Sequence, residues 1–153
     1  MAWIDRPDDK EFAEQVFAND RQNTEWLRGL IEEHGWLGKS IVGKEGADAT
    51  FLLVQHSPDL SFQQYCLTLL EAAVLVKEAK PENLAYLIDR VRIAEGKKQI
   101  YGTQGTHVDG VIVPSPIEDE ANVDVRRKSV KLRLPLAKYF AMMNELYKTG
   151  PAK

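Results

Sequence analysis

Residues 61–73, SFQQYCLTLLEAA, repeat apolar side chains at the spacing of an α-helix. The apolar positions make one broad stripe, formed by Phe62, Tyr65, Cys66, Leu69, Leu70 and Ala73. A stripe of this width is typical of a helix that packs into a protein core. Asp59 or Ser61 is expected to cap the first turn, because both side chains accept hydrogen bonds from free backbone amides. Pro58 separates this helix from the segment before it.

The segment before Pro58 predicts more helix. Residues 8–34 keep apolar positions at helical spacing, which indicates one long helix or two abutting ones. Asp8 or Asp9 is the expected N-cap, and Gly35 is the expected stop.

Three glycines, Gly38, Gly43 and Gly46, then indicate a loop. After them, residues 47–56 predict a short helix. The face expected to be apolar carries Ala49, Leu52, Leu53 and His56.

The segment after residue 73 contains another helix and then a change of period. Pro81 fits the first turn of a helix that runs to about residue 94 and stops near Gly96. Residues 99–104 alternate as a strand does, and the Asp109-Gly110 pair is the turn signal of a β-hairpin.

Residues 111–113 form the expected second strand, and Pro114 ends it. Short helices are expected at residues 122–130 and 135–147. An isolated hairpin is only marginally stable, so it is expected to pack against the helices.

These segments predict a mainly α fold, a compact single-domain helical bundle of about five to seven helices with one small β-hairpin packed against it. A length of 153 residues with 44% hydrophobic residues suits one globular domain over residues 1–153. The ends, residues 1–7 and 149–153, are expected to be loosely ordered.

Composition argues against several classes of partner. Twenty basic and 23 acidic residues give a net charge of −3 without an extended basic block, so nucleic acid is not the expected partner. The single cysteine, Cys66, rules out an internal disulfide and fits a reducing, cytoplasmic location. No run approaches the roughly 18 apolar residues of a membrane span. The sequence leaves the oligomeric state open.

Two polar residues fall on or beside the apolar stripe of residues 8–34. Asp20 and Asn23 lie three positions apart, so both can point toward the interior. A buried carboxylate without partners is costly, so such a site is paired, hydrated or occupied by ligand. The alternative is that Asp20 caps a second helix that begins near Arg21.

His56 and Gln55 end the apolar run FLLVQH of residues 51–56. An imidazole titrates near neutral pH, so His56 is a candidate general acid or base, and Gln55 is a candidate substrate-binding residue. The alternative is a structural histidine bonded to the carbonyls of the helix end.

Two further pairs of candidates follow. In LAYLIDRV, residues 84–91, Asp89 and Arg90 interrupt an apolar helix and predict either an interior ion pair or an anion-binding arginine oriented by an acid. Neighbouring residues point about 100° apart on a helix, so the two are not expected to pair with each other. The alternative is a solvated helix rim.

The expected strand over residues 99–104 presents one polar, aromatic face that includes Tyr101 and Thr103. Tyr101 is a candidate proton or hydrogen-bond donor, with Thr103 and Gln104 as substrate-binding candidates. A hairpin with one solvated face gives the same pattern.

The ordered motifs DxxNT (20–24), HGW (34–36), LLVQH (52–56), LAYLxDRV (84–91), YGTQ (101–104), PIED (116–119) and VDxRR (123–127) span nearly the whole chain. Together they resemble a bacterial family known as domain of unknown function 6624. The resemblance implies no particular reaction. Its recurring polar residues lie on different elements, a pattern more typical of a pocket than of a core.

The resulting hypothesis is a small enzyme without cofactor or metal that performs acid–base chemistry on a polar or anionic small molecule. His56 moves the proton, Asp89 or Asp20 orients it, Arg90 holds the anionic group and Tyr101 stabilises developing charge, in one cleft that also includes Asn23 and Gln104. Cyclisation, dehydration, isomerisation and hydrolysis all fit these roles. The alternative is a non-catalytic module that binds a peptide or protein through the same cleft and the exposed aromatics Trp3, Trp26 and Trp36.

Overall fold

The computed structural model describes residues 10–149 of the chain, so the candidate caps Asp8 and Asp9 and the candidate anchor Trp3 lie outside the described residues. The protein is 69% helical, and its described part contains six α-helices and one antiparallel hairpin, which confirms the predicted mainly α class. In chain order the elements are α1 (Lys10–His34), α2 (Lys39–His56), α3 (Leu60–Leu75), α4 (Pro81–Ala94), β1 (Gly105–Val108), β2 (Val111–Pro114), the 3-10 helix η1 (Glu120–Asn122), α5 (Val123–Ser129) and α6 (Leu136–Thr149).

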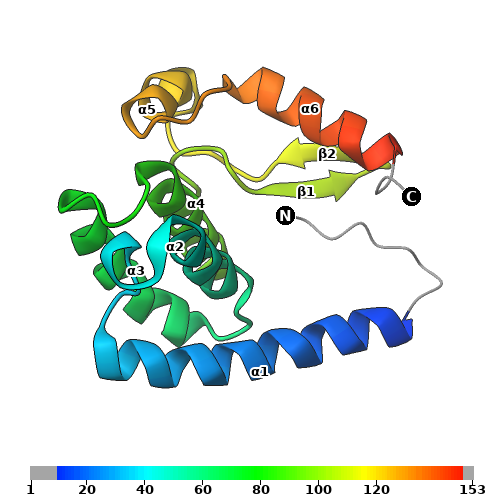
Figure 1. The fold of residues 1–153 in the computed structure, drawn as a ribbon. Helices are drawn as coiled ribbons and strands as arrows, with labels where there is room; N and C mark the ends of the chain where they lie inside the picture. The colour runs from blue at the N-terminus through cyan, green and yellow to red at the C-terminus, as the bar shows by residue number, and fades with distance from the viewer. Residues whose placement is uncertain (1–9, 150–153) are drawn as a thin grey trace. The chain divides into compact units, whose positions relative to one another are not determined.

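The chain forms two compact units that meet in sequence inside α4, between Leu87 and Ile88. In the N-terminal unit, which ends at Leu87, α1 packs on α2 and α2 packs on α3 (Figure 1). The core of this unit is apolar and includes Leu27, Ile31, Phe51, Val54, Phe62, Cys66 and Leu70.

Helix α1 is continuous through Asp20, so this residue does not cap a second helix. The predicted stop is confirmed: Gly35 has a positive φ of 73°, and its amide donates to the Ile31 carbonyl at 2.8 Å. A glycine adopts this left-handed conformation without steric cost, which ends the helix.

Helix α2 differs from the prediction in its start and in its buried face. The expected loop is wrong, because the helix already begins at Lys39 and is interrupted only at Gly43, where φ is 74° and ψ is 174°. Leu52 is 52% exposed, so the predicted apolar face is also wrong. The buried residues of α2 are Ala47, Thr50, Phe51, Val54 and Gln55. The apolar run at positions 51–54 covers every direction of a helix, so periodicity alone cannot choose its buried side.

The junction between α2 and α3 is held by two polar side chains. Asp59 caps α3 as predicted, accepting from the Phe62 amide at 2.9 Å, and its other oxygen pairs with Arg28 at 2.7 Å. Gln63 is buried and donates to the carbonyls of Val54, Gln55 and Ser57 at 3.1, 3.2 and 3.1 Å. These bonds satisfy acceptors that the end of a helix leaves without partners.

Cys66 is fully buried on α3, and burial raises the pKa of its thiol to about 12 although the nearby Arg28 charge lowers it. The thiol therefore stays protonated at pH 8, and we expect the folded protein to react with a thiol reagent at least about 100-fold more slowly than the unfolded chain. Because the folded pKa lies above the unfolded value of about 8.5, the stabilisation linked to this group is complete below pH 8.5 and declines as pH rises toward 12. Timed labelling in buffer and in urea measures the ratio, and equal rates would contradict a buried Cys66.

In the C-terminal unit, which begins at Ile88, the hairpin turns at Asp109-Gly110 as predicted, and Gly105 pairs with Pro114 at its open end. The first strand begins at Gly105, so the prediction of a strand at residues 99–104 is wrong. Helix α6 lies along the hairpin (Figure 1), and Asn144 bonds both the amide and the carbonyl of Ile112, at 2.7 and 2.8 Å.

Candidate functional site

Asp89 is the centre of a buried polar network in the C-terminal unit. It is fully buried, and its carboxylate oxygens accept from the amides of Ile100, Tyr101 and Thr103 at 2.7, 3.0 and 2.9 Å. The Thr103 hydroxyl adds a further bond at 2.9 Å. Residues 99–104 curl around this one carboxylate instead of forming a strand, because a buried charge needs all the donors that it can reach.

Two more side chains, one from the segment itself and one from α5, hold its conformation. Gln99 is fully buried, accepts from the Gln104 amide and donates to the carbonyls of Gln104 and Ser115, each at 2.8 Å. Arg127 is 2% exposed and donates to the carbonyls of Tyr101, at 2.8 Å, and Gly102, at 3.1 Å. Amides and carbonyls of the segment are thus both paired, which fixes its conformation.

The first helices after the hairpin complete this enclosure. Arg127 also donates to the Leu134 carbonyl at 2.8 Å and lies 4.9 Å from the centre of the Tyr139 ring, a cation–π distance. Tyr139 donates from its hydroxyl to the Thr103 carbonyl at 3.1 Å, and Arg126 donates to the Ile100 carbonyl at 2.9 Å. Arg126 and Arg127 belong to the only basic triplet of the sequence, and both donate hydrogen bonds to backbone carbonyls within the C-terminal unit.

The backbone conformation favours glycine at position 102. Gly102 has a φ of +66°, a left-handed conformation that strains residues with a side chain, and a Cβ there would lie 2.5 Å from Leu136 Cδ1, so that side chain would have to shift.

Three predicted substrate-binding or catalytic residues lie on this segment. Thr103 is buried and bound to Asp89, and Gln104 donates to the Thr103 hydroxyl at 3.0 Å. Tyr101 is half-buried, and burial together with the Asp89 charge raises the pKa of its phenol, while Arg126 lowers it. The phenol is therefore protonated at neutral pH, a form that can donate a hydrogen bond.

Arg90 follows Asp89 on α4, and the two do not pair, as predicted from their positions on the helix. The Nε atom of Arg90 is buried and has no hydrogen-bond partner among residues 10–149. No ion pair within those residues involves its guanidinium. Burial lowers the pKa of Arg90, the effect expected for a cation withdrawn from water.

The remaining candidates belong to the N-terminal unit. Asp20 and Asn23 are partly exposed on α1, and the Asp20 carbonyl accepts from the Thr24 hydroxyl at 2.7 Å. Thr24 also lies 3.0 Å from the Ser57 hydroxyl, so this face of α1 contacts the turn that follows His56.

Gln55 and His56 end α2, as predicted. Gln55 is buried, and its side-chain oxygen has no partner within the described part of the chain. His56 is half-buried and forms the last residue of the helix. The structure thus brings Asp89, Tyr101, Thr103 and Gln104 together in one unit and places Asp20, Asn23, Gln55 and His56 in the other.

The sequence did not reveal Gln99, Arg127 and Tyr139 as members of the network. The VDxRR motif contains Arg127, but a basic run is typical of an exposed surface and gives no sign that one arginine is buried. The prediction that Trp36 is an exposed anchor is wrong, since Trp36 is only 9% exposed and packs in the N-terminal unit.

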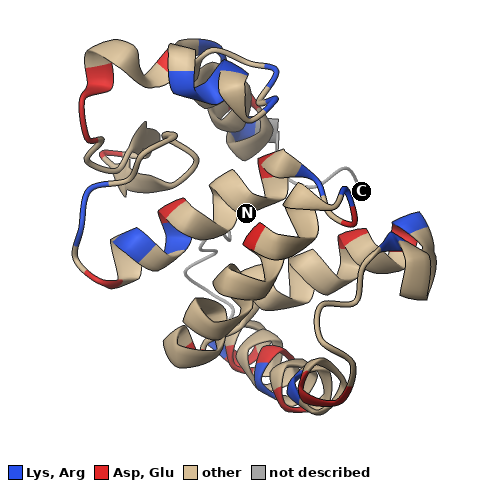
Figure 2. Cartoon of the chain, turned by 90° about the vertical axis from the view of Figure 1, so that its left-hand side faces the viewer, with Lys and Arg blue, Asp and Glu red and all other residues tan. Residues whose placement is uncertain are grey.

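Side chains of both charge signs occur along α1, whereas α3 carries the single charged residue Glu71 (Figure 2). No helix in residues 10–149 is long and apolar enough to cross a membrane. Those residues also contain no group of three or more His, Cys, Asp or Glu side chains placed to hold a metal ion.

The fold and the network define a mainly α protein in which one buried aspartate organises a loop, and the Nε of the arginine that follows this aspartate has no partner among residues 10–149. A family model described as a family of unknown function, DUF6624, matches residues 1–150, so the chain belongs to this family and the resemblance is confirmed. No match to the chain was found among curated proteins or among solved structures.

Proposed function

We propose that this protein is a small enzyme that performs acid–base chemistry on a polar or anionic small molecule without an organic cofactor. The observation that carries the proposal is Arg90, whose Nε is buried and without a partner among the described residues. The residue as a whole is partly buried, and a donor withdrawn from water without a partner is costly, so a bound anion would stabilise it. A carboxylate or phosphate is the natural partner, because its oxygens match the geometry of a guanidinium.

Asp89 supports this role by positioning its neighbours. Its oxygens already accept four hydrogen-bonding groups from Ile100, Tyr101 and Thr103, so its charge is directed at the loop and leaves Arg90 for a ligand. The same bonds tie the Arg90 helix to the loop that carries Tyr101. A site built in this way is preorganised, since binding requires little rearrangement of the backbone.

Tyr101, whose backbone amide is bonded to Asp89, supplies a titratable hydroxyl. Its raised pKa keeps the hydroxyl protonated at neutral pH, so it can donate a proton or stabilise negative charge that develops on a substrate. Cyclisation, dehydration, isomerisation and hydrolysis can all use such a donor. His56 stays the proposed proton-transfer residue of the N-terminal unit, and His56→Ala tests it separately: loss of turnover with an unchanged fold supports the role.

We also propose that the protein works in a reducing, cytoplasmic location, because its sequence contains a single cysteine.

The test is a screen of the full chain against pools of small carboxylates and phosphate esters, followed by thermal unfolding and by mass spectrometry for conversion. We expect at least one compound to raise the unfolding midpoint by about 5–10 °C at roughly 100 times its Kd. Arg90→Gln is expected to remove both the shift and the conversion. Arg133→Gln is the matched control, because it removes the same charge from an exposed position in the same unit.

The outcomes separate the possibilities. Conversion that depends on Arg90 and not on Arg133 supports the enzyme. Binding without conversion supports a non-catalytic module. If no anion stabilises the protein, or if the two variants lose binding equally, Arg90 does not form an anion site.

One observation favours the non-catalytic alternative. Trp26 is 61% exposed on α1, and exposed tryptophans often anchor protein contacts. In that case Trp26→Ala is expected to abolish the biological activity of the chain, while Arg90→Gln leaves it unchanged. The enzyme proposal predicts the reverse.

A further inference from the structure

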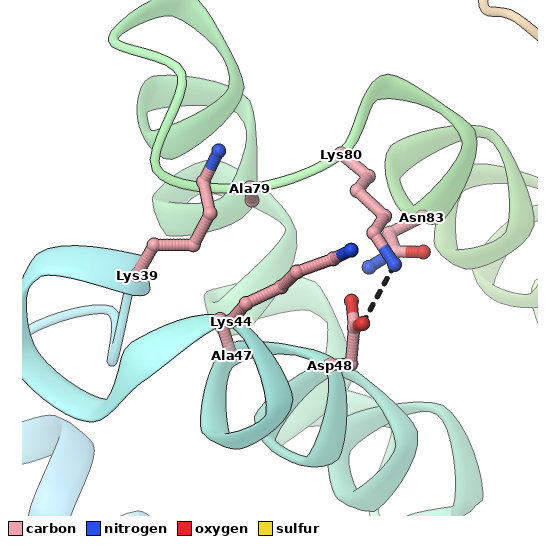
Figure 3. A pocket seen from close by; sticks show the side chains of 7 residues that line it. All are labelled: Lys39, Lys44, Ala47, Asp48, Ala79, Lys80 and Asn83. Carbon is pink, nitrogen blue, oxygen red and sulfur yellow. Dashed lines mark hydrogen bonds and ion pairs between the residues drawn. The ribbon is translucent and has the colours of Figure 1, made fainter.

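A second group of cations surrounds a hollow in the N-terminal unit, and it does not depend on the function proposed above. The hollow has a volume of about 100 Å³ and is lined by Lys39, Lys44, Ala47, Asp48, Ala79, Lys80 and Asn83 (Figure 3). This volume exceeds what one water molecule needs and is well below the roughly 300–1,000 Å³ of pockets that enclose drug-sized ligands. Its size suits one small ion or one terminal group of a larger molecule.

The lining carries an excess of positive charge. Three lysines and one aspartate give it a formal charge of +2. Asp48 pairs with Lys80 at 2.6 Å, whereas Lys39 and Lys44 have no ion pair with a carboxylate in the described ranges. Figure 3 shows Lys44 extending across the hollow toward Lys80 and Asp48, with Lys39 on the opposite wall.

The backbone of the hollow is fixed on both sides. Glu78 accepts from the Ser40 amide at 2.8 Å, and its carbonyl accepts from the Lys39 amide at 3.2 Å, so the turn before α4 is tied to the start of α2. The Glu78 carboxylate is thus bonded to a backbone amide in the first turn of α2. The break at Gly43 directs the chain so that Lys39 and Lys44, from the two parts of α2, line the same space.

Asn83 gives an independent sign of a ligand. Its side chain lines the hollow, is only 9% exposed, and makes no hydrogen bond to another described residue. In Figure 3 the only dashed line joins Lys80 to Asp48. Asn83 also lies in the first turn of α4, where the helix dipole favours an anion. A buried amide that no described side chain or backbone group bonds, beside the Lys39 and Lys44 ammonium groups that have no ion pair in residues 10–149, is the arrangement expected of an anion site.

We propose that this hollow binds a phosphoryl group, with Lys39, Lys44 and Lys80 as its cationic contacts and Asn83 as a hydrogen-bond donor. A dianionic phosphate balances the charge of +2, whereas a single carboxylate leaves half of it without a partner. The group is either free phosphate or the end of a phosphorylated compound, and the two sources share this chemistry.

The test is an NMR titration of the full chain with inorganic phosphate, phenyl phosphate and acetate at constant ionic strength. We expect saturable shifts of the backbone amides of residues 39–48 and 79–84 with the phosphates. Lys44→Gln is expected to weaken phosphate binding about 10-fold, and Asn83→Asp more than that, because the new carboxylate repels the anion. Lys77→Gln is the matched control: it removes an exposed lysine on the same turn that does not line the hollow.

Each result of the titration either supports the phosphoryl site or overturns it. Tighter binding of phenyl phosphate than of inorganic phosphate identifies a phosphorylated compound as the ligand, and equal or weaker binding identifies free phosphate. Absence of saturable shifts, a response to acetate as strong as the response to phosphate, or equal losses in Lys44→Gln and Lys77→Gln would overturn the proposal. Circular dichroism of each variant confirms that it is folded, and Arg90→Gln is expected to leave these shifts unchanged.

Discussion

Asp89→Asn is expected to destabilise the protein by about 3–5 kcal/mol, the largest effect that we anticipate for a single substitution. The asparagine has the same shape, but its amide nitrogen cannot accept from the donors that now surround the carboxylate. The amides of Ile100, Tyr101 and Thr103 lie within 3.0 Å of Asp89 oxygens, and at least one of them loses its acceptor. Urea unfolding followed by circular dichroism measures the free energy.

Asp20→Asn is the control for this change. It removes the same charge at a partly exposed position on α1 whose carboxylate makes no hydrogen bond to a described residue, so we expect a change within about 0.5 kcal/mol. If the free energy of unfolding of Asp89→Asn also lies within about 0.5 kcal/mol of that of the unmodified protein, the loop amides do not depend on the carboxylate for stability.

Arg127→Ala is expected to have the second largest effect, a loss of about 3 kcal/mol. The arginine is 2% exposed, and its removal leaves the carbonyls of Tyr101, Gly102 and Leu134 without the donors seen in the structure. The side chain also packs on the Tyr139 ring, so the substitution leaves a cavity as well. The same urea experiment gives the free energy of unfolding.

Arg133→Ala serves as the comparison, because Arg133 is exposed and its side chain makes no hydrogen bond to the network within residues 10–149. We expect it to change stability by less than about 0.5 kcal/mol. Similar losses in the two variants would mean that Arg127 acts through net charge and not through the bonds that it donates.

The helix boundaries were largely predictable because each is set by a local signal. Gly35 ends α1 through its positive φ, Asp59 caps α3, and Pro81 occupies the first turn of α4. The hairpin turn at Asp109-Gly110 belongs to the same category. Such signals act over four residues or fewer, so one sequence is enough to recognise them.

The features that were missed depend on contacts between distant parts of the chain. Asp89 was recognisable as a charge in an apolar helix, but its partners include backbone amides of residues 100–103. Every residue except proline has such an amide, so the sequence does not show which amides bind the carboxylate. The same carboxylate explains why residues 99–104 do not form the predicted strand: they turn their amides inward to it. In α2, consecutive apolar residues hid the buried side, which packing against α1 and α3 selects.

The sequence therefore predicted which residues belong to the candidate site but not what each of them does there. Asp89 and Arg90 were both identified, and the prediction that they do not pair agrees with the structure. Nothing in the residue pattern indicates that the loop amides occupy the Asp89 carboxylate while the Nε of Arg90 keeps no partner among the described residues. That difference directs the proposed function to Arg90.

The most direct test follows the Nε–H resonance of Arg90 in ¹⁵N-labelled protein while small carboxylates and phosphate esters are added. Arg90→Lys identifies the peak, and Arg133 provides an exposed arginine in the same spectrum. We predict that the Arg90 signal shifts saturably with at least one class of anion while the Arg133 signal stays in place. An Arg90 signal that no anion moves, or that moves only in step with Arg133, would contradict the anion site on which the proposed function rests.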